Sequence, residues 1–138
     1  MIVNPIPWPN GKRCAVALSW DVDADSGRNP AAVDLILENG HELALHGYLH
    51  ERSNELSHED EAKVLERGIE AFVRTAGAKP RGWRAPAFAF SKHSLDLLIG
   101  AGFDYDSSLM GDEIPYMLEG DAGRLIETGS TSSPSSAK

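Results

Sequence analysis

Two histidines four residues apart, His46 and His50, are the residues of this chain whose type and spacing most directly suggest chemistry. Neutral imidazole is a common zinc ligand, and either a helix or a turn can bring two rings at this spacing to one ion. Gly47 stands between them and favours a turn after the preceding apolar run. Histidine pairs at this spacing also occur by chance on surfaces, so a metal site requires a further ligand elsewhere in the chain.

Two carboxylates upstream, Asp21 and Asp23, offer that ligand. Residues two apart in an extended segment point the same way, and two such close carboxylates repel unless a dication lies between them. One aspartate with two histidines completes the three protein ligands of a catalytic zinc site, and the other aspartate can then accept a proton from a bound water. The alternative is an acidic loop that stabilises the N-terminus of the helix after Asn29.

Arg84 lies in the largely apolar run Gly82–Pro86. An arginine among apolar neighbours usually pairs with a carboxylate. It can serve as a fork that orients Asp21, or it can form a structural ion pair elsewhere, for instance with Asp106. The run Asp106–Ser108 is also common turn chemistry after a strand, so Asp106 is the weaker candidate for a functional residue.

The apolar pattern predicts alternating strands and helices that would position these residues. A near-continuous apolar run indicates a strand buried on both faces, and its carboxyl end would carry the two aspartates. The expected strands cover residues 13–20, 41–44 and 103–105, and residues 82–86 are expected to form a short strand and a turn. The expected helices begin after Asn29, Ser57 and Ser91 and end at Gly40, Gly77 and Gly102. This alternation indicates an α/β fold with parallel strands.

Composition limits the classes of function. The 138 residues suit a single domain, and the formal net charge of −8 argues against a nucleic-acid partner. Cys14 is the one cysteine, so no internal disulfide can form. No apolar run approaches the roughly 20 residues of a membrane helix, and the proline-rich first ten residues do not read as a signal peptide. We therefore expect a cytoplasmic protein without a membrane partner.

Four short motifs occur in an order that resembles a known family. They are Asp21–Asp23, His46–His50, Gly82–Pro86 and Asp104–Ser108. Over residues 10–127 the chain resembles the polysaccharide deacetylase family (NodB homology, carbohydrate esterase family four), and most of all its peptidoglycan-deacetylase-like and allantoinase-like branch. The resemblance implies a distorted (β/α) barrel and a metal-dependent hydrolase of carbon–nitrogen bonds other than peptide bonds, with a carbohydrate substrate.

The resemblance also implies a role for each matching residue. Asp21 matches the catalytic base, Arg84 matches the arginine that positions this base, and Asp106 matches a supporting position. The ligands of the metal, Zn²⁺ or another divalent cation, match Asp23, His46 and His50.

The chain departs from the family pattern in two places. Residues 24–45 leave room for one helix and one short strand where family members have a further strand–helix unit, so we expect an incomplete barrel over 1–127 and a disordered tail over 128–138. No histidine follows His93, whereas the late family motif supplies a histidine as general acid. Since general acid–base assistance contributes about 10²–10⁴-fold, we expect a slow enzyme at best.

The sequence leaves two alternatives open. The chain can be a degenerate, non-catalytic relative that binds a metal or ligand and completes its barrel by forming a homo-oligomer. It can also be a metal-independent, allantoinase-like hydrolase whose substrate is a small cyclic amide.

Overall fold

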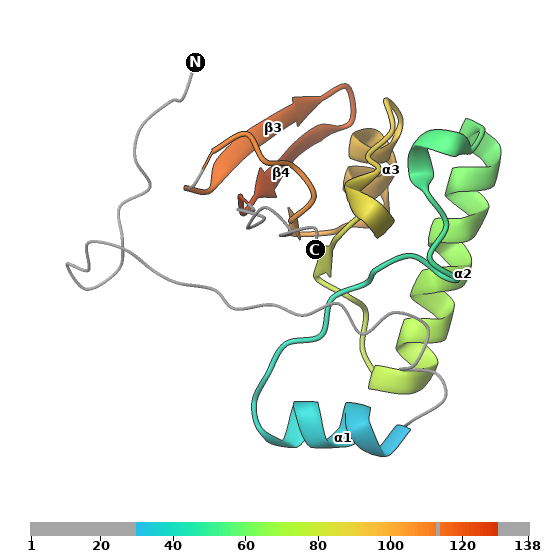
Figure 1. Ribbon diagram of the computed structural model, residues 1–138, viewed down its shortest axis with the longest axis vertical. Coiled ribbons are helices and arrows are strands. Elements are labelled where there is room, and N and C mark those ends of the chain that lie inside the picture. Colours follow the sequence, from blue (N-terminus) through green and yellow to red (C-terminus); the bar gives the residue numbers. More distant parts are fainter. Residues whose placement is uncertain (1–29, 113, 130–138) are drawn as a thin grey trace, which may run out of the picture.

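The computed structural model describes residues 30–112 and 114–129, and these ranges contain three α-helices and a small mixed sheet (Figure 1). The predicted strand at 13–20 lies outside the described residues, as do Cys14, Asp21 and Asp23. The α-helices are α1 (Pro30–Glu38), α2 (His58–Ala76) and α3 (Ser94–Ala101), and the short 3₁₀ turns are η3 (Ser53–Glu55) and η4 (Pro86–Phe88). Helix α3 packs against the sheet, and α1 packs against α2. None of the helices in the described ranges is long and apolar enough to cross a membrane.

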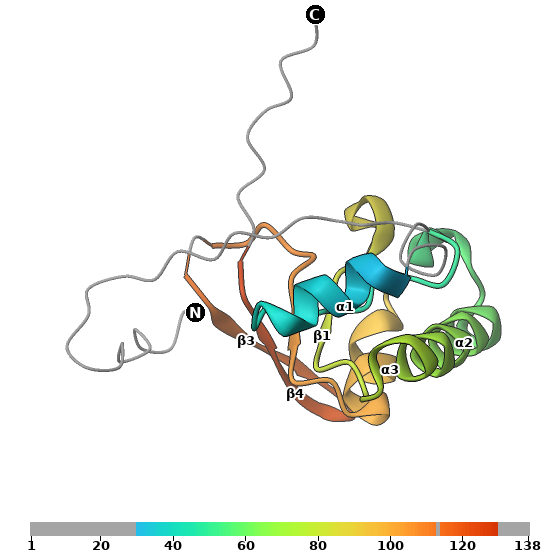
Figure 2. The ribbon, with the colours of Figure 1, turned by 90° about the horizontal axis from the view of Figure 1, so that it is seen from below.

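The sheet has four strands in the order β1-β2-β4-β3. Their bounds are β1 (Gly82–Trp83), β2 (Tyr105–Asp106), β3 (Tyr116–Gly120) and β4 (Gly123–Glu127). The first three in spatial order run parallel, and β3 pairs with β4 as an antiparallel hairpin at the edge. Figure 1 shows the hairpin strands beside α3, with α1 at the opposite end of the view, and Figure 2 shows the same elements from below. The expected α/β class with parallel strands is confirmed.

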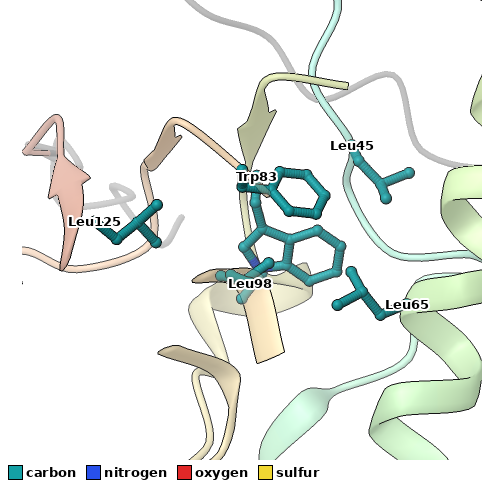
Figure 3. Close-up of a cluster of buried hydrophobic side chains, with 7 residues drawn as sticks. Leu45, Leu65, Trp83, Leu98 and Leu125 are labelled. Carbon is teal, nitrogen blue, oxygen red and sulfur yellow. The ribbon is translucent and has the colours of Figure 1, made fainter. Parts of the chain in front are cut away.

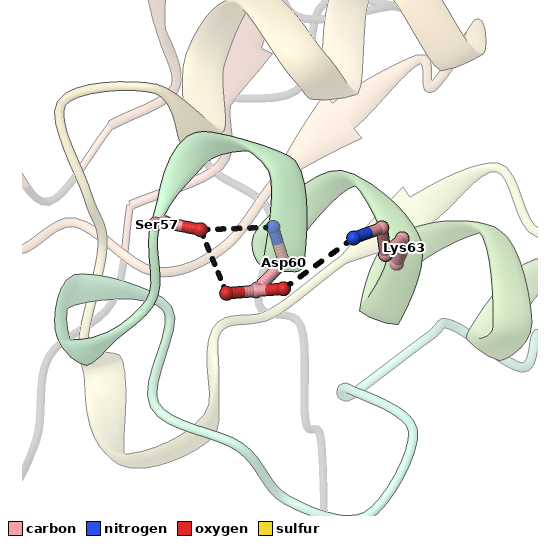
Figure 4. A network of polar contacts seen from close by, with 3 residues as sticks. All are labelled: Ser57, Asp60 and Lys63. Carbon is pink, nitrogen blue, oxygen red and sulfur yellow. Dashed lines mark hydrogen bonds and ion pairs between the residues drawn. The ribbon is translucent and has the colours of Figure 1, made fainter.

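Helix α2 begins and ends where the sequence predicts. The Ser57 hydroxyl oxygen accepts the backbone N–H of Asp60 at 3.2 Å and donates to its carboxylate at 2.7 Å (Figure 4). The ammonium group of Lys63 lies 3.6 Å from the same carboxylate. Gly77 ends the helix in the left-handed region with φ 73°.

Helix α3 begins slightly later than the sequence suggests. The Ser91 hydroxyl oxygen accepts the backbone N–H groups of His93 and Ser94 at 2.9 and 3.1 Å, so it caps the first turn although the helix proper starts at Ser94. Gly102 ends the helix at φ 81°, as predicted. Glu61 of α2 is buried and accepts the hydroxyls of Ser91 and Ser94, which joins the N-terminal ends of the two helices.

The hydrophobic core surrounds Trp83. Figure 3 shows its indole beside Leu45, Leu65 and Leu98. Trp83 is 4% exposed and meets the ring of Phe103 edge-on, with 6.2 Å between ring centroids. Trp83 is therefore a core residue, and it belongs to the same buried cluster as Leu65 of α2 and Leu98 of α3.

Two expected strands need correction, and one hairpin was missed. The strand predicted at 41–44 is only a single parallel bridge between Leu45 and Trp83. The strand predicted at 103–105 is shifted to Tyr105–Asp106, because Phe103 turns into the core. The hairpin of β3 and β4 was not predicted. Its turn is held by the Asp96 carboxylate of α3, which accepts the backbone N–H of Ala122 at 2.8 Å.

Candidate active site

The two histidines singled out in the sequence lie next to one another. The ring centroids of His46 and His50 are 5.2 Å apart, with the ring planes 73° from parallel. Two imidazoles that bind one tetrahedral zinc at about 2.0–2.1 Å have their centroids roughly 5 Å apart. The pair is thus already spaced as two ligands of a single ion would be.

A backbone carbonyl orients the first of these rings. The Nδ1 atom of His46 lies 2.8 Å from the carbonyl oxygen of Arg84. A carbonyl can only accept, so Nδ1 must carry the proton and the lone pair of a neutral ring then resides on Nε2. This is the arrangement that a metal-binding histidine usually has, since its second nitrogen donates to a carbonyl or carboxylate.

The loop that carries the histidines has an unusual backbone. Gly47 has φ 75°, and His50 has φ 65°, which is uncommon for a residue other than glycine. A Cβ atom at Gly47 would lie 2.8 Å from Cγ of Pro86, so this loop fits closely against residues 84–86, which we call the arginine turn. Gly68 of α2 allows a similarly close approach, because a Cβ there would meet Leu45 at 3.2 Å. Strain of this kind concentrates at functional sites.

The side chain of Arg84 is held by the segment after β2. Its Nε donates to the carbonyl oxygen of Ser107 at 3.1 Å, and a terminal nitrogen donates to the Ser107 hydroxyl at 2.8 Å. The guanidinium also lies 5.8 Å from the ring centroid of Phe88. The sequence left open an ion pair between Arg84 and Asp106. In the structure the Asp106 carboxylate bonds to Ser108 instead.

Asp106 supports the arginine turn indirectly. It is fully buried and accepts the backbone N–H of Ser108 at 3.1 Å and the Ser108 hydroxyl at 2.6 Å. That hydroxyl oxygen in turn accepts the backbone N–H of Ala85 at 2.8 Å. Asp106 therefore fixes the backbone next to Arg84 through Ser108.

A second buried carboxyl, Glu127, was missed in the sequence. It is the β4 neighbour of Asp106 in strand register, is fully buried, and accepts the backbone N–H groups of Leu109 and Gly129 at 3.3 and 3.1 Å. Burial, and next a hydrogen bond to Asp106, raise the pKa of Glu127 to about 8, and burial also raises the pKa of Asp106. The available signal was its position two residues after Leu125, on the buried face of a strand.

The described residues bring together part of the predicted site. His46 and His50 are adjacent, and Arg84 contacts His46 through its backbone. Within residues 30–112 and 114–129 no group of three histidine, cysteine, aspartate or glutamate side chains forms a metal cluster. The third ligand and the base predicted from the sequence, Asp23 and Asp21, belong to the part of the chain that the structure does not describe.

Comparison with known proteins places these loops in a family. The sequence profile of polysaccharide deacetylase matches residues 14–105, which is about two thirds of the chain. The chain belongs to the polysaccharide deacetylase family. It is 37% identical over 95 residues to a peptidoglycan deacetylase of Helicobacter pylori, an alignment that covers 67% of this chain and 32% of that relative. The chain thus spans about a third of the length of this curated relative.

Solved structures of deacetylases share the fold. A polysaccharide deacetylase from Mycobacterium smegmatis is 38% identical with a TM-score of 0.72, and the match covers 82% of this chain and 43% of that one. The Puue allantoinase, at 21% identity, has a TM-score of 0.68 over 77% of this chain and 35% of its own, and shows likeness of fold alone. The expected NodB-type architecture, as an incomplete barrel, is confirmed.

Proposed function

We propose that this chain carries the metal-binding part of an N-deacetylase that hydrolyses the carbon–nitrogen bond of N-acetyl groups on a polysaccharide of the peptidoglycan class. The observation that carries the proposal is the pairing of His46 with His50, with the Arg84 carbonyl fixing the tautomer of His46. The peptidoglycan deacetylase relative at 37% identity supports the substrate class.

The proposed metal ligands are His46 and His50 together with Asp23. The fit rests on the spacing of the two rings and on the Arg84 carbonyl, which accepts from Nδ1 of His46 and so leaves the metal-binding lone pair of the neutral ring on Nε2. Nitrogen and carboxylate ligands suit Zn²⁺. When bound, zinc polarises a carbonyl oxygen and lowers the pKa of a water to about 7.

The chain's own groups have separate tasks in this proposal. Asp21 takes a proton from the attacking water, as the family pattern implies for its position. Arg84 orients Asp21, and the rigid hold of Ser107 on its guanidinium supports this role. The water's oxygen joins the acetyl carbon, the carbon–nitrogen bond breaks, and the leaving nitrogen takes up the proton that Asp21 removed from the water, so the products are acetate and a free amine.

The test is release of acetate from an N-acetylated glycan by the purified full chain, with zinc added or chelated. Activity that needs zinc and disappears in Asp21→Asn supports the proposal. Full activity after chelation supports the metal-independent, allantoinase-like alternative and overturns the metal assignment. Zinc binding without any acetate release supports the non-catalytic alternative and overturns the catalytic assignment.

A further inference from the structure

A continuous series of hydrogen bonds links the buried carboxyl pair to the histidine loop. Glu127 bonds to Asp106, and Asp106 accepts the hydroxyl of Ser108 at 2.6 Å. The oxygen of that hydroxyl accepts the backbone N–H of Ala85 at 2.8 Å. The carbonyl that precedes this N–H in the same peptide unit is that of Arg84, the acceptor of His46. One rigid peptide plane therefore connects Ser108 on one side with His46 on the other.

The two carboxyl groups share one proton. Asp106 and Glu127 are register partners on adjacent parallel strands, and each is fully buried. Two such close carboxylates cannot both ionise in a site of low dielectric constant. Asp106 accepts two hydrogen bonds from Ser108, at 2.6 and 3.1 Å, whereas Glu127 accepts two longer ones from backbone N–H groups, at 3.1 and 3.3 Å. The shorter bonds favour the charged form of Asp106. The proton accordingly resides on Glu127, which donates it to Asp106.

The surroundings of Glu127 favour this neutral form. Asp106 faces it from β2, and Tyr116 is its register partner on β3. The pKa of Tyr116 is raised by burial and then by the charge of Glu127, with smaller effects from Asp106 and Asp112. Of these groups, Asp106 is charged near pH 8 and disfavours a second negative charge on Glu127, whereas Tyr116, whose pKa is raised, is still an uncharged phenol there.

We infer that Glu127 is a positioning residue for the proposed metal site, and that its neutral carboxyl holds Asp106, Ser108 and the Arg84–Ala85 peptide in the geometry that orients His46. Glutamine keeps a donor at this position without a titrating proton, whereas alanine removes the donor. The inference rests on the proposed function for its consequence in metal binding, but the hydrogen-bond series can be tested without any metal.

The first measurement is amide hydrogen exchange at Ala85 in the full, metal-free chain between pH 6 and 9.5. We expect the protection factor to fall about fivefold around pH 8, because an ionised Glu127 no longer donates to Asp106 and Asp106 is then less firmly held against Ser108. This change is equivalent to losing one net hydrogen bond. In Glu127→Gln the protection stays at the high level throughout, and in Glu127→Ala it is low at every pH. A matched control is Glu119→Gln in the exposed part of the same hairpin, which keeps the behaviour of the unsubstituted chain.

The second measurement is zinc affinity at pH 7. We expect Glu127→Gln to bind zinc as the unsubstituted chain does, and Glu127→Ala to bind roughly 10–100-fold more weakly, the usual cost of losing a group that supports a metal ligand. If no variant binds zinc, the proposed function fails while the Ala85 exchange still decides the role of Glu127. Protection at Ala85 that does not change with pH, or that changes equally in Glu127→Gln, would overturn the inference even if Glu127→Ala does not fold.

Discussion

The carbonyl oxygen of Arg84 lies 2.8 Å from Nδ1 of His46, and this contact joins the arginine turn to the histidine loop. The two segments also share the parallel bridge between Leu45 and Trp83, so His46 is positioned by a neighbour in the sheet as well as by its own loop. In the proposed site the backbone of Arg84 orients a metal ligand and its side chain orients the base. A single turn thereby couples both halves of the chemistry.

The fit between the histidine loop and Pro86 predicts a large effect of Gly47→Ala. Gly47 has φ 75°, and its new Cβ would lie 2.8 Å from Cγ of Pro86. Gly40 is a matched control, because it has the same φ but nothing within 4 Å of an added Cβ. Both substitutions carry the backbone cost of about 1–2 kcal/mol, and Gly47→Ala adds about 1–3 kcal/mol of crowding. Equal losses in the free energy of unfolding, measured in urea, would show that the two loops do not interlock.

Removal of the cap at the start of α2 should weaken the fold measurably. Ser57→Ala removes the acceptor of the Asp60 backbone N–H, and such caps contribute about 0.5–2 kcal/mol. Lys63→Ala, which removes only an exposed ion-pair partner in the same network, should change the free energy of unfolding by less than about 0.5 kcal/mol. Urea denaturation of the two variants provides the comparison. A larger loss for Lys63→Ala than for Ser57→Ala would contradict this ranking.

The core around Trp83 should be sensitive to cavities. Leu98 is 1% exposed, and Leu98→Ala is expected to lower the free energy of unfolding by about 2–5 kcal/mol through lost burial and a residual cavity. Leu35, on α1, is 60% exposed and serves as the control, with an expected change within about 0.5 kcal/mol. The account of the core fails if thermal and urea unfolding give similar stabilities for both variants.

The raised pKa of Glu127 predicts how stability depends on pH. Its pKa is about 8 in the folded chain against 4.5 for an ordinary glutamate, so the folded state binds this proton more tightly between these values. The free energy of unfolding contributed by the group is therefore fully present below about pH 4.5, falls as pH rises and is lost above about pH 8. In Glu127→Gln this component of the slope disappears. Urea unfolding at a series of pH values checks it, and identical slopes in both proteins would refute it.

Local signals in the sequence were sufficient for the helices. Helix α2 begins after Ser57 and ends at Gly77, as predicted, because capping depends on a few neighbouring residues. The histidine pair and the arginine turn could also be located, since each is a short contiguous motif.

Long-range pairing was much harder to predict. The 41–44 strand reduces to a bridge at Leu45, because what pairs there depends on β1, far away in the chain. Glu127 was missed for a related reason, since two of the groups that satisfy its buried carboxyl, Asp106 and the backbone N–H of Leu109, come from another part of the chain. The roles of Asp21 and Asp23 stay predictions because those residues lie outside the described ranges.

The most direct test of the account is a crystal structure of the full chain grown with zinc, with data collected on both sides of the zinc absorption edge. The account predicts one anomalous peak about 2.0–2.1 Å from a nitrogen of His46 and of His50, and within similar reach of an Asp23 carboxylate oxygen. It also predicts that the Nδ1 of His46 still faces the carbonyl of Arg84. A crystal without a peak beside these two rings, or with His46 binding zinc through Nδ1, would contradict the proposed site.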